Sequence, residues 1–343
     1  MGICLYQAKD QSRWDDFVKR SPDATLYHQI GWKDVVERSF GHKGYYWFAE
    51  DSAGNIKGIL PVIHLKSFFF GSFMVSLPYF NYGGICAEDN AARFELLDAA
   101  VVGAKRAGAE HIEFRQQTQL CADLPVKTAK VSMRLDLPAS ADALFQSFDA
   151  KLRSQVRRPT KEGMEARIGG IEELDSFYGV FSENMRDLGT PVYAKSFFNN
   201  ILLAFPGTSW ICTVYKGSVP VASGFLVGFR EMLEIPWASS LSGYKRFSPN
   251  MLLYWTVLKF ACDRSFKTFD FGRSTPDEGT YRFKEQWGAK PVPLYWHYWI
   301  SKGGTLPELS PKNPKYRLAI AMWKKLPVSV TKIVGPSVVR NLP

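Results

Sequence analysis

The chain has 343 residues, of which 46% are apolar and 22% charged, a balance that excludes an intrinsically disordered protein. This length predicts two domains, each large enough to bury a core of its own. The formal net charge of +10 is compatible with nucleic acid, an anionic membrane surface or a phosphorylated substrate as partner. Seven of these ten charges lie in residues 302–343, so the rest of the chain is nearly neutral.

The sequence shows no pattern of a metal site, a secretion signal or a membrane-spanning segment. The five cysteines are odd in number and widely spaced, which predicts neither a disulfide scaffold nor a metal site. The first sixteen residues contain no apolar segment of a secretion signal. The longest apolar stretch, Phe68–Leu77, is far shorter than the ~20 residues of a membrane-spanning helix. We therefore expect a cytoplasmic protein.

The first half of the chain predicts a hairpin, a helix and a strand. Residues 45–65 alternate as two strands around a turn at Ser52–Asn55. A helix is expected over 91–107, with Phe94, Leu97, Val101 and Ala104 on its apolar face. A short strand follows at 111–115.

The second half repeats this order. Residues 210–229 predict a hairpin, 232–239 a third strand, and 249–265 a helix with Ser248 as N-cap and Pro249 in its first turn. A strand follows at 267–272. Glu113 and Asp270 stand 157 residues apart in these corresponding strands, which indicates a duplicated α/β unit of about 150 residues. We expect domains at 1–137 and 138–300 and a basic tail at 301–343.

Two further segments are basic. A helix capped by Ser140 should lead into a stripe of Arg153, Arg157 and Lys161 at i, i+4 spacing, which Pro159 should break or kink near Arg158. In the tail, the stretch YRLAIAMWKKL predicts a short amphipathic helix. Its interleaved apolar and cationic residues are typical of segments that lie on anionic membranes, and equally of a tail docked on its own domain.

Residues 269–291 hold the densest set of chemically useful side chains. A strand runs into a glycine-containing loop, and strand-end loops of α/β folds are common ligand sites. Arginine and lysine there suit a phosphate or a developing oxyanion. The candidate binding residues of this loop are Arg273, Ser274, Tyr281 and Arg282, beside Lys284.

Three other functions are excluded by missing parts. Asp-Phe-Gly at 270–272 lacks the glycine loop, the lysine strand and the catalytic loop of a protein kinase. Ser274 does not lie in a GxSxG elbow, so serine hydrolysis is not supported. No helix-turn-helix, RRM or zinc-finger signature is present, which argues against sequence-specific binding of nucleic acid.

Four motifs in order resemble one family. They are YHQIGW (27–32), LPYFNYGG (77–84), LRSQVRRPTKEG (152–163) and DFGRST…GTYRFKEQWGA (270–289). Together they resemble FemAB-type proteins, a two-domain branch of the GNAT (acyl-CoA N-acyltransferase) superfamily. The likeness is closest to FemAB-related proteins of PEP-CTERM/exosortase and exopolysaccharide systems. It implies an α/β (α+β) fold of tandem duplicated GNAT-like domains, each a mixed, mostly antiparallel sheet flanked by helices.

The resemblance implies acyl or aminoacyl transfer to an amine of a cell-envelope or exopolysaccharide precursor. Lys284 matches the lysine thought to stabilise the reaction centre, and our hypothesis is that Lys284, helped by Arg273, stabilises negative charge while Asp270 or Glu285 orients or deprotonates the amine. The resemblance also implies a substrate or donor role for five residues elsewhere: Tyr79, Asn81, Tyr82, Arg153 and Arg157.

The donor stays open between acyl-CoA and aminoacyl-tRNA. The sequence lacks both the helical arm that tRNA-using relatives often insert and the Q/R-x-x-G-x-G/A loop of CoA-using enzymes, where GYKRFSPN (243–250) stands instead. The helix beginning at Pro249 could still bind an anion through its first amides. An alternative function is a non-catalytic module of the same fold that binds a sugar- or lipid-linked precursor. The tail would place either protein peripherally at the inner membrane face.

Overall fold

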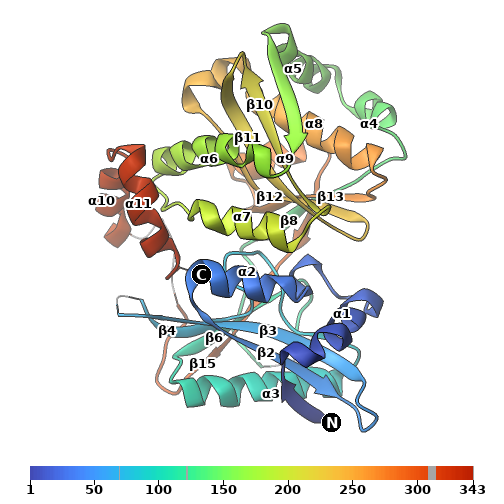
Figure 1. The fold of residues 1–343 in the computed structure, drawn as a ribbon, viewed down its shortest axis with the longest axis vertical. Helices are drawn as coiled ribbons and strands as arrows, with labels where there is room; N and C mark the ends of the chain where they lie inside the picture. The colour runs from blue at the N-terminus through green and yellow to red at the C-terminus, as the bar shows by residue number, and fades with distance from the viewer. Residues whose placement is uncertain (69, 121–122, 308–313, 343) are drawn as a thin grey trace. The chain divides into compact units, whose positions relative to one another are not determined.

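The computed structural model describes residues 1–68, 70–120, 123–307 and 314–342. The chain divides into two compact units. The first comprises Met1–Val131, Pro293–Glu308 and Arg340–Pro343, and the second comprises Ser132–Val292 and Leu309–Val339. Each unit therefore draws on chain from both halves of the sequence, as the colours of Figure 1 show.

Each unit is built on one mixed sheet. The strand orders are β1-β2-β3-β4-β6-β15-β7 and β9-β10-β11-β12-β13-β8-β14, which correspond place by place. Both sheets contain a parallel pair at the same place, β4–β6 and β12–β13, beside antiparallel hairpins. The fold predicted from the sequence, two mixed sheets flanked by helices, is confirmed. The strands are β1 Gly2–Leu5, β2 Lys43–Glu50, β3 Ile56–Ser67, β4 Gly71–Val75, β5 Cys86–Ala87, β6 His111–Gln116, β7 Val126–Lys127, β8 Val131–Asp136, β9 Met164–Gly169, β10 Ser209–Lys216, β11 Val219–Phe229, β12 Met232–Ser240, β13 Thr268–Ser274, β14 Lys290–Pro293 and β15 Tyr295–Ile300.

In each sheet, the strand next to the parallel pair comes from the part of the chain that leads out of the other sheet. β15 follows the second sheet's β13 along the chain but pairs with β6 in the first sheet. β8 follows the first sheet's β7 but lies next to β13 in the second. Both carboxylate-bearing strands, β6 and β13, thus have a neighbour that is distant in sequence.

Helices cover both faces of the first sheet (Figure 1). α1 (Gln11–Arg20) and α2 (Gly31–Phe40) pack on one face, and α3 (Asn90–Ala107) packs on the other. The fully buried residues of α3 are Ala92, Leu96, Ala100 and Ala104. Of the expected apolar face, Ala104 is buried and Leu97 and Val101 pack partly buried against the same core, so the prediction was wrong for Phe94. Small side chains bring the helix close to the sheet, while the larger Phe94 stays 42% exposed.

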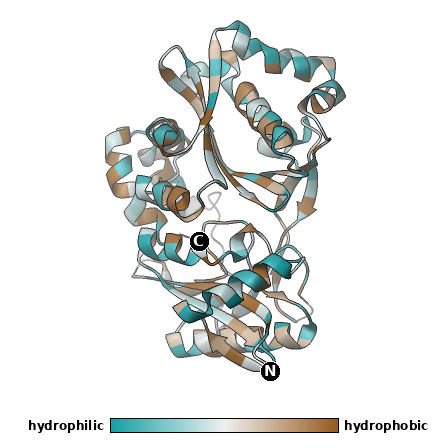
Figure 2. Ribbon diagram, turned by 45° about the vertical axis from the view of Figure 1, so that its right-hand side comes forward, coloured by the Kyte–Doolittle hydropathy of each residue, from teal (hydrophilic) through white to brown (hydrophobic). Residues whose placement is uncertain are grey.

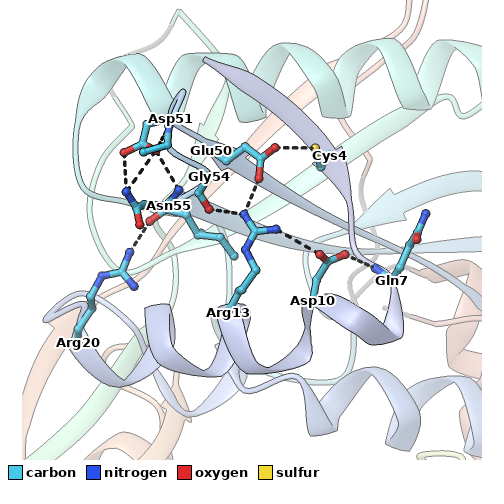
Figure 3. Close-up of polar contacts among 11 residues, drawn as sticks. Cys4, Gln7, Asp10, Arg13, Arg20, Glu50, Asp51, Gly54 and Asn55 are labelled. Atoms are coloured by element: carbon cyan, nitrogen blue, oxygen red, sulfur yellow. Dashed lines mark hydrogen bonds and ion pairs between the residues drawn. The ribbon is translucent and has the colours of Figure 1, made fainter.

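An arginine ties α1 to the turn between β2 and β3 (Figure 3). Arg13 donates to Glu50 Oε2 at 2.5 Å, to Asp10 Oδ1 at 3.2 Å and to the carbonyl of Gly54. Asp51 closes the same turn by accepting from the backbone N–H of Asn55 at 2.9 Å. The expected hairpin turn is thus held both by Arg13 of α1 and by its own residue Asp51.

The second sheet is covered in the same way. α6 (Leu174–Leu188) and α7 (Lys195–Ala204) pack on one face, and α4 (Ala141–Ser147), α5 (Ala150–Lys161) and α8 (Pro249–Asp263) pack on the other. Ser140 caps α4 as expected, because its Oγ accepts from Ala143 N at 3.2 Å.

Proline and capping account for three differences from expectation. α5 does not end near Arg158 but continues through a buried Pro159 to Lys161, since only one bond is lost so close to a helix end. Ser248 stands at the start of α8 but has φ 57° and makes no side-chain cap. The tail forms the expected helix α10 (Pro314–Trp323) and an unexpected one, α11 (Val328–Val339), which tolerates Pro336.

The C-terminal helices belong to the second unit. α11 packs on α6, with Thr331, Gly335 and Val339 on its buried face. Gly335 lies against Val192, where a Cβ would come within 2.8 Å of backbone. In the described ranges, no helix is long and apolar enough to cross a membrane.

Candidate functional site

The parallel pair of the second sheet opens into a fork. β12 and β13 pair only at Met232↔Thr268, Leu233↔Phe269 and Glu234↔Asp270. Just beyond, β12 carries a bulge against β11, since Phe225 pairs with Trp237 but Val227 with Glu234. Pro236 lies in this bulge, the kind of place where an inner strand tolerates a residue without an N–H. The two strands therefore part after Glu234 and Asp270.

Asp270 organises the strand end at the fork. Its carboxylate is fully buried and accepts from Ser132 Oγ at 2.6 and 2.8 Å and from Arg134 Nε at 3.1 Å. It also accepts from the backbone N–H of Gly272 at 2.7 Å, and Gly272 has φ 75°. This left-handed conformation favours glycine and turns the carbonyls of the strand end toward the next helix.

Lys284 reaches this strand end from α9 (Gly279–Glu285). Its Nζ donates to the carbonyls of Gly272 and Arg273, both at 2.9 Å, and the residue is 7% exposed. Two of the three ammonium protons are thus used, and the third has no acceptor within the described chain. The ammonium is therefore held in place with one donor left for a ligand.

Burial sets the charge state of Lys284. It lowers the pKa of the ammonium from 10.5 to about 8, against the opposing charges of Asp270 and Glu234. The nearby Arg273 lowers the pKa further. At neutral pH the group is cationic but close to its titration, which is common at reactive sites.

Ser274 ends β13 with an orphan hydroxyl. The residue is 4% exposed, and its Oγ has no hydrogen-bond partner in the part of the chain that the structure describes. A buried polar atom without a partner is rare in folded proteins, so this hydroxyl indicates a place for a ligand.

The other predicted loop residues lie around this point. Arg273 and Arg282 are exposed, Tyr281 is half-buried, and Glu285 is exposed. Glu285 lines a cavity on a different flank of α9 from the one that Lys284 uses. The structure thus brings Asp270, Lys284 and the end of β13 together, and turns Glu285 away from that cluster.

The basic stripe on α5 has structural contacts. Arg153 donates to the carbonyls of Gln146 at 3.2 Å and Phe148 at 3.0 Å, which satisfies the end of α4. Arg157 lies 5.0 Å from the ring centre of Phe145. Both side chains therefore hold α4 against α5.

The predicted residues of the first unit lie in the loop after β4. Tyr79 has φ 75°, stacks on Phe40 at 4.1 Å, and donates to the carbonyl of Arg340 at 2.8 Å. The carbonyl of Asn81 accepts from Trp296 Nε1 at 3.1 Å. Tyr82 is fully buried beside Tyr27, in a packing position.

Sequence reasoning missed three residues of the fork, Ser132, Arg134 and Glu234. Glu234 is a single charge inside an apolar strand and is fully buried. Ser132 and Arg134 alternate in VSMRLD, which places both on one face of β8. A charged residue inside a buried strand was the available signal. Among the described residues, no group of His, Cys, Asp or Glu could hold a metal.

Comparisons with known proteins agree with this architecture. Residues 146–285, which include β12, β13 and Lys284, match the acetyltransferase (GNAT) domain family. FemX superposes with a TM-score of 0.66 at 16% identity, over 86% of this chain and 97% of that one. The C-terminal domain of a putative lysylphosphatidylglycerol synthetase from Agrobacterium fabrum gives 0.57 at 15% identity, over 86% and 92%.

A tandem GNAT protein from the clavulanic acid biosynthesis pathway gives a TM-score of 0.54 at 9% identity, over 89% of this chain and 99% of that one. At these identities the likeness establishes the fold, which is of the GNAT type. No curated protein matches the sequence significantly.

Proposed function

We propose that the protein is a FemAB-like N-acyltransferase whose reaction centre is the fork between β12 and β13. The observation that carries the proposal is Lys284, a buried ammonium with a pKa of about 8, two protons bound by carbonyls and one left for a ligand. A fixed cation of this kind is suited to a developing oxyanion, because it needs no reorganisation when the charge forms.

The reaction would run as follows. A neutral amine attacks the acyl carbon, a C–N bond forms, and the carbonyl oxygen becomes an oxyanion that accepts from Lys284. Collapse breaks the bond to the donor's thiol or ribose oxygen, and the proton lost by the amine returns to that leaving group. The buried Asp270 already accepts hydrogen bonds from three donors, Ser132, Arg134 and Gly272, so it serves as a positioning residue. Glu285 lies on a different flank of α9 from Lys284, so the proton of the amine reaches the leaving group through water rather than through Glu285.

Replacing Lys284 tests the reaction centre. Lys284→Ala should lower kcat by about 10²–10³-fold, the usual cost of losing one oxyanion donor. Lys290→Ala removes an exposed lysine six residues away and should leave kcat unchanged. A Lys284→Ala protein with a native circular dichroism spectrum and unchanged turnover would remove Lys284 from the mechanism.

The donor is acyl-CoA or aminoacyl-tRNA, both of which carry phosphate. Cations gather just before α8, where Lys216 and Arg246 lie 3.8 and 4.6 Å from the ring centre of Phe247. The segment holding Arg246 and Phe247, η4 (Ser242–Phe247), follows the open end of β12. A thermal-shift series with acetyl-CoA, longer acyl-CoAs and aminoacyl-tRNA separates the donors, because a bound donor raises the Tm with its concentration over Kd.

The acceptor in this proposal is an amine of a cell-envelope or exopolysaccharide precursor, and the cellular setting is a PEP-CTERM-type system. The four sequence motifs support this assignment. So does the fold shared with FemX and with a protein named as a lysylphosphatidylglycerol synthetase. Transfer of label from a radioactive donor to an extracted envelope fraction measures it directly. A label that reaches only small soluble amines would contradict it.

We propose that the C-terminal helices bind this enzyme peripherally to an anionic membrane. Leu318, Met322 and Ile333 are 72%, 62% and 78% exposed, and the exposed Lys324 and Lys325 follow α10. Figure 2 shows hydrophobic and hydrophilic residues interleaved along these helices, the pattern of segments that lie in a lipid interface.

Ile333→Glu should abolish co-sedimentation with vesicles that contain phosphatidylglycerol. Val102→Glu alters an exposed valine on α3 and should leave co-sedimentation unchanged. Equal partitioning of both variants and the wild type would contradict membrane association through these helices.

A further inference from the structure

The hairpin of β3 and β4 projects from one end of the first sheet (Figure 1). The ladder between β2 and β3 ends at Lys43↔His64, whereas β3 and β4 continue to pair as far as Ser67↔Gly71. Three residues of β3 therefore reach about 10 Å beyond β2, at ~3.3 Å per residue. On the other side, β6 pairs with β4 only from Met74 onward. Within the described ranges, no strand thus flanks the end of this hairpin.

The turn of the hairpin presents phenylalanine to solvent. Phe68 directly follows β3 and is 97% exposed, and Phe70 is partly exposed. The base of the hairpin is braced, because Glu110 N donates to the carbonyl of Ser72 at 2.7 Å and His64 Nε2 lies 2.9 Å from Ser72 Oγ. A scattered exposed apolar residue is ordinary on a protein surface. Here, however, two rings stand in one turn at the tip of a projecting, braced element.

The end of the sheet from which the hairpin projects is cationic. The start of β2, the end of β3, the end of α3 and the end of β15 meet there: Lys105 Nζ on α3 lies 5.9 Å from the ring centre of Trp299 on β15, and Ser301 N donates to the carbonyl of Glu110 at 2.8 Å. Exposed cations occupy all four places: Lys43, Lys66, Lys105, Arg106 and Lys302.

Two acidic side chains also lie at this end. Glu110 is exposed, and its Oε1 lies 3.4 Å from Ser72 N at the base of the hairpin. Glu37 on α2 accepts from Lys33 at 2.6 Å, so its charge is balanced on its own helix. The cations outnumber these carboxylates, and the surface around the hairpin is therefore positively charged.

Area decides between a lipid and a protein as the partner of this tip. A phenylalanine buries about 150–250 Å², so two rings offer at most about 500 Å². A stable protein interface needs about 800 Å² of complementary surface on each partner. A lipid interface needs no complementary shape, accepts apolar side chains into its acyl region, and attracts lysine and arginine to anionic headgroups.

We propose that the β3–β4 hairpin inserts into the interface of an anionic membrane. Phe68 and Phe70 enter the boundary of the acyl region, while Lys43 and Lys66 contact the lipid phosphates. The hairpin belongs to the first unit, so this contact is separate from that of α10 and α11 in the second. It deepens the proposed function, on which it rests in sharing the anionic membrane. Stable peripheral attachment usually takes two such contacts.

Phe68→Ser tests the insertion in the full chain. With vesicles that contain phosphatidylglycerol, it should lower the partition coefficient at least tenfold, and its Tm should be unchanged because the ring is exposed. Phe94→Ser, at the 42% exposed phenylalanine of α3, is the matched control and should partition as the wild type does. Equal partitioning of Phe68→Ser and wild type would overturn the proposal and favour a protein partner. So would a wild type that binds no vesicle.

Lys66→Gln tests the contact with headgroups. Removing one cation near an anionic surface should weaken binding to phosphatidylglycerol vesicles about fivefold. Binding to vesicles of phosphatidylcholine alone should not change. An equal loss on both kinds of vesicle would overturn the headgroup contact, because Lys66 would then act through the fold of the hairpin.

Photocrosslinking separates the hairpin from the C-terminal helices and from catalysis. With p-benzoylphenylalanine at position 68, irradiation on vesicles should attach lipid to the protein, and the same group at position 94 should attach none. Lipid attached at position 68 in a protein that transfers no acyl group would support the hairpin and refute the enzyme. Acyl transfer to a membrane-borne acceptor, with the KM unchanged in Phe68→Ser and no lipid attached at position 68, would support the enzyme and refute the hairpin.

Discussion

The two parallel strand pairs of the molecule begin alike and end differently. In the first sheet, β4 and β6 pair at Val75↔Glu113, and the loop after β4 continues the contact: Ser76 N donates to the carbonyl of Glu113 at 2.9 Å and Gly83 N to that of Arg115 at 3.2 Å. In the second sheet the ladder ends at Glu234↔Asp270. The loop thus closes the first fork, while the second stays open.

The charges follow the same division. Glu113 accepts from Arg115 Nε and from the Tyr298 hydroxyl, both at 2.6 Å, and Arg115 lies 4.4 Å from the ring centre of Trp296. Burial raises the pKa of Glu113, but Arg115 and Tyr298 outweigh it, so the net shift is downward. The charge of Glu113 is therefore balanced by Arg115 on the same strand. The second fork instead ends in a lysine with a proton to donate and a serine hydroxyl that has no partner among the residues the structure describes.

This comparison indicates that the corresponding forks of the two duplicated units have different roles. A closed fork with an internal ion pair contributes rigidity, and an open fork with incomplete polar contacts is where a ligand would complete the structure. The shared strand order makes the loop after β4 the feature that distinguishes the two.

Breaking the ion pair of the closed fork should have the largest effect on stability. Glu113→Gln leaves the Arg115 charge buried without its carboxylate, which costs about 3–5 kcal/mol in the free energy of unfolding. Urea denaturation measures this loss, with the exposed Glu95→Gln on α3 as control. A loss below about 1 kcal/mol would mean that the first fork is not held by this pair.

In the open fork, Lys284 should make the free energy of unfolding depend on pH. The folded pKa of Lys284, about 8, lies below its ordinary 10.5, so between these pH values the unfolded chain binds more protons than the folded chain. The free energy of unfolding should therefore rise with pH across this window, by up to about 3 kcal/mol at 1.36 kcal/mol per pKa unit.

Lys284→Met removes the titrating group and provides the reference. Urea denaturation of both proteins from pH 7.5 to 10.5 should give curves that diverge in favour of the wild type as pH rises. Parallel curves would show that Lys284 titrates at its ordinary pKa and would remove the electrostatic basis of the open fork.

Sequence reasoning recovered the repeated order of elements because turns and apolar periodicity are local signals. The hairpins at 45–65 and 210–229 and the helix at 249–265 all appear in the structure. It could not recover the strand exchange, since the partner of Asp270 on β8 lies 138 residues away in the chain. Ser132 and Arg134 entered the site only through that pairing, whereas Lys284 and Ser274 stood in a motif that could be read directly.

The smallest expected effect compares two buried serines, Ser76 beside the first fork and Ser274 at the end of β13 in the second. Ser76 Oγ accepts from Arg115 N at 2.7 Å, so Ser76→Ala leaves a buried N–H without a partner and should cost about 1–3 kcal/mol of stability with no effect on a substrate's KM. Ser274→Ala removes a hydroxyl that has no partner within the described residues, so stability should be unchanged or slightly higher. If a ligand completes the open fork, the KM of the donor should rise several-fold in Ser274→Ala alone. Equal stability losses in the two variants would place Ser274 in the packing of the fold rather than in a binding site.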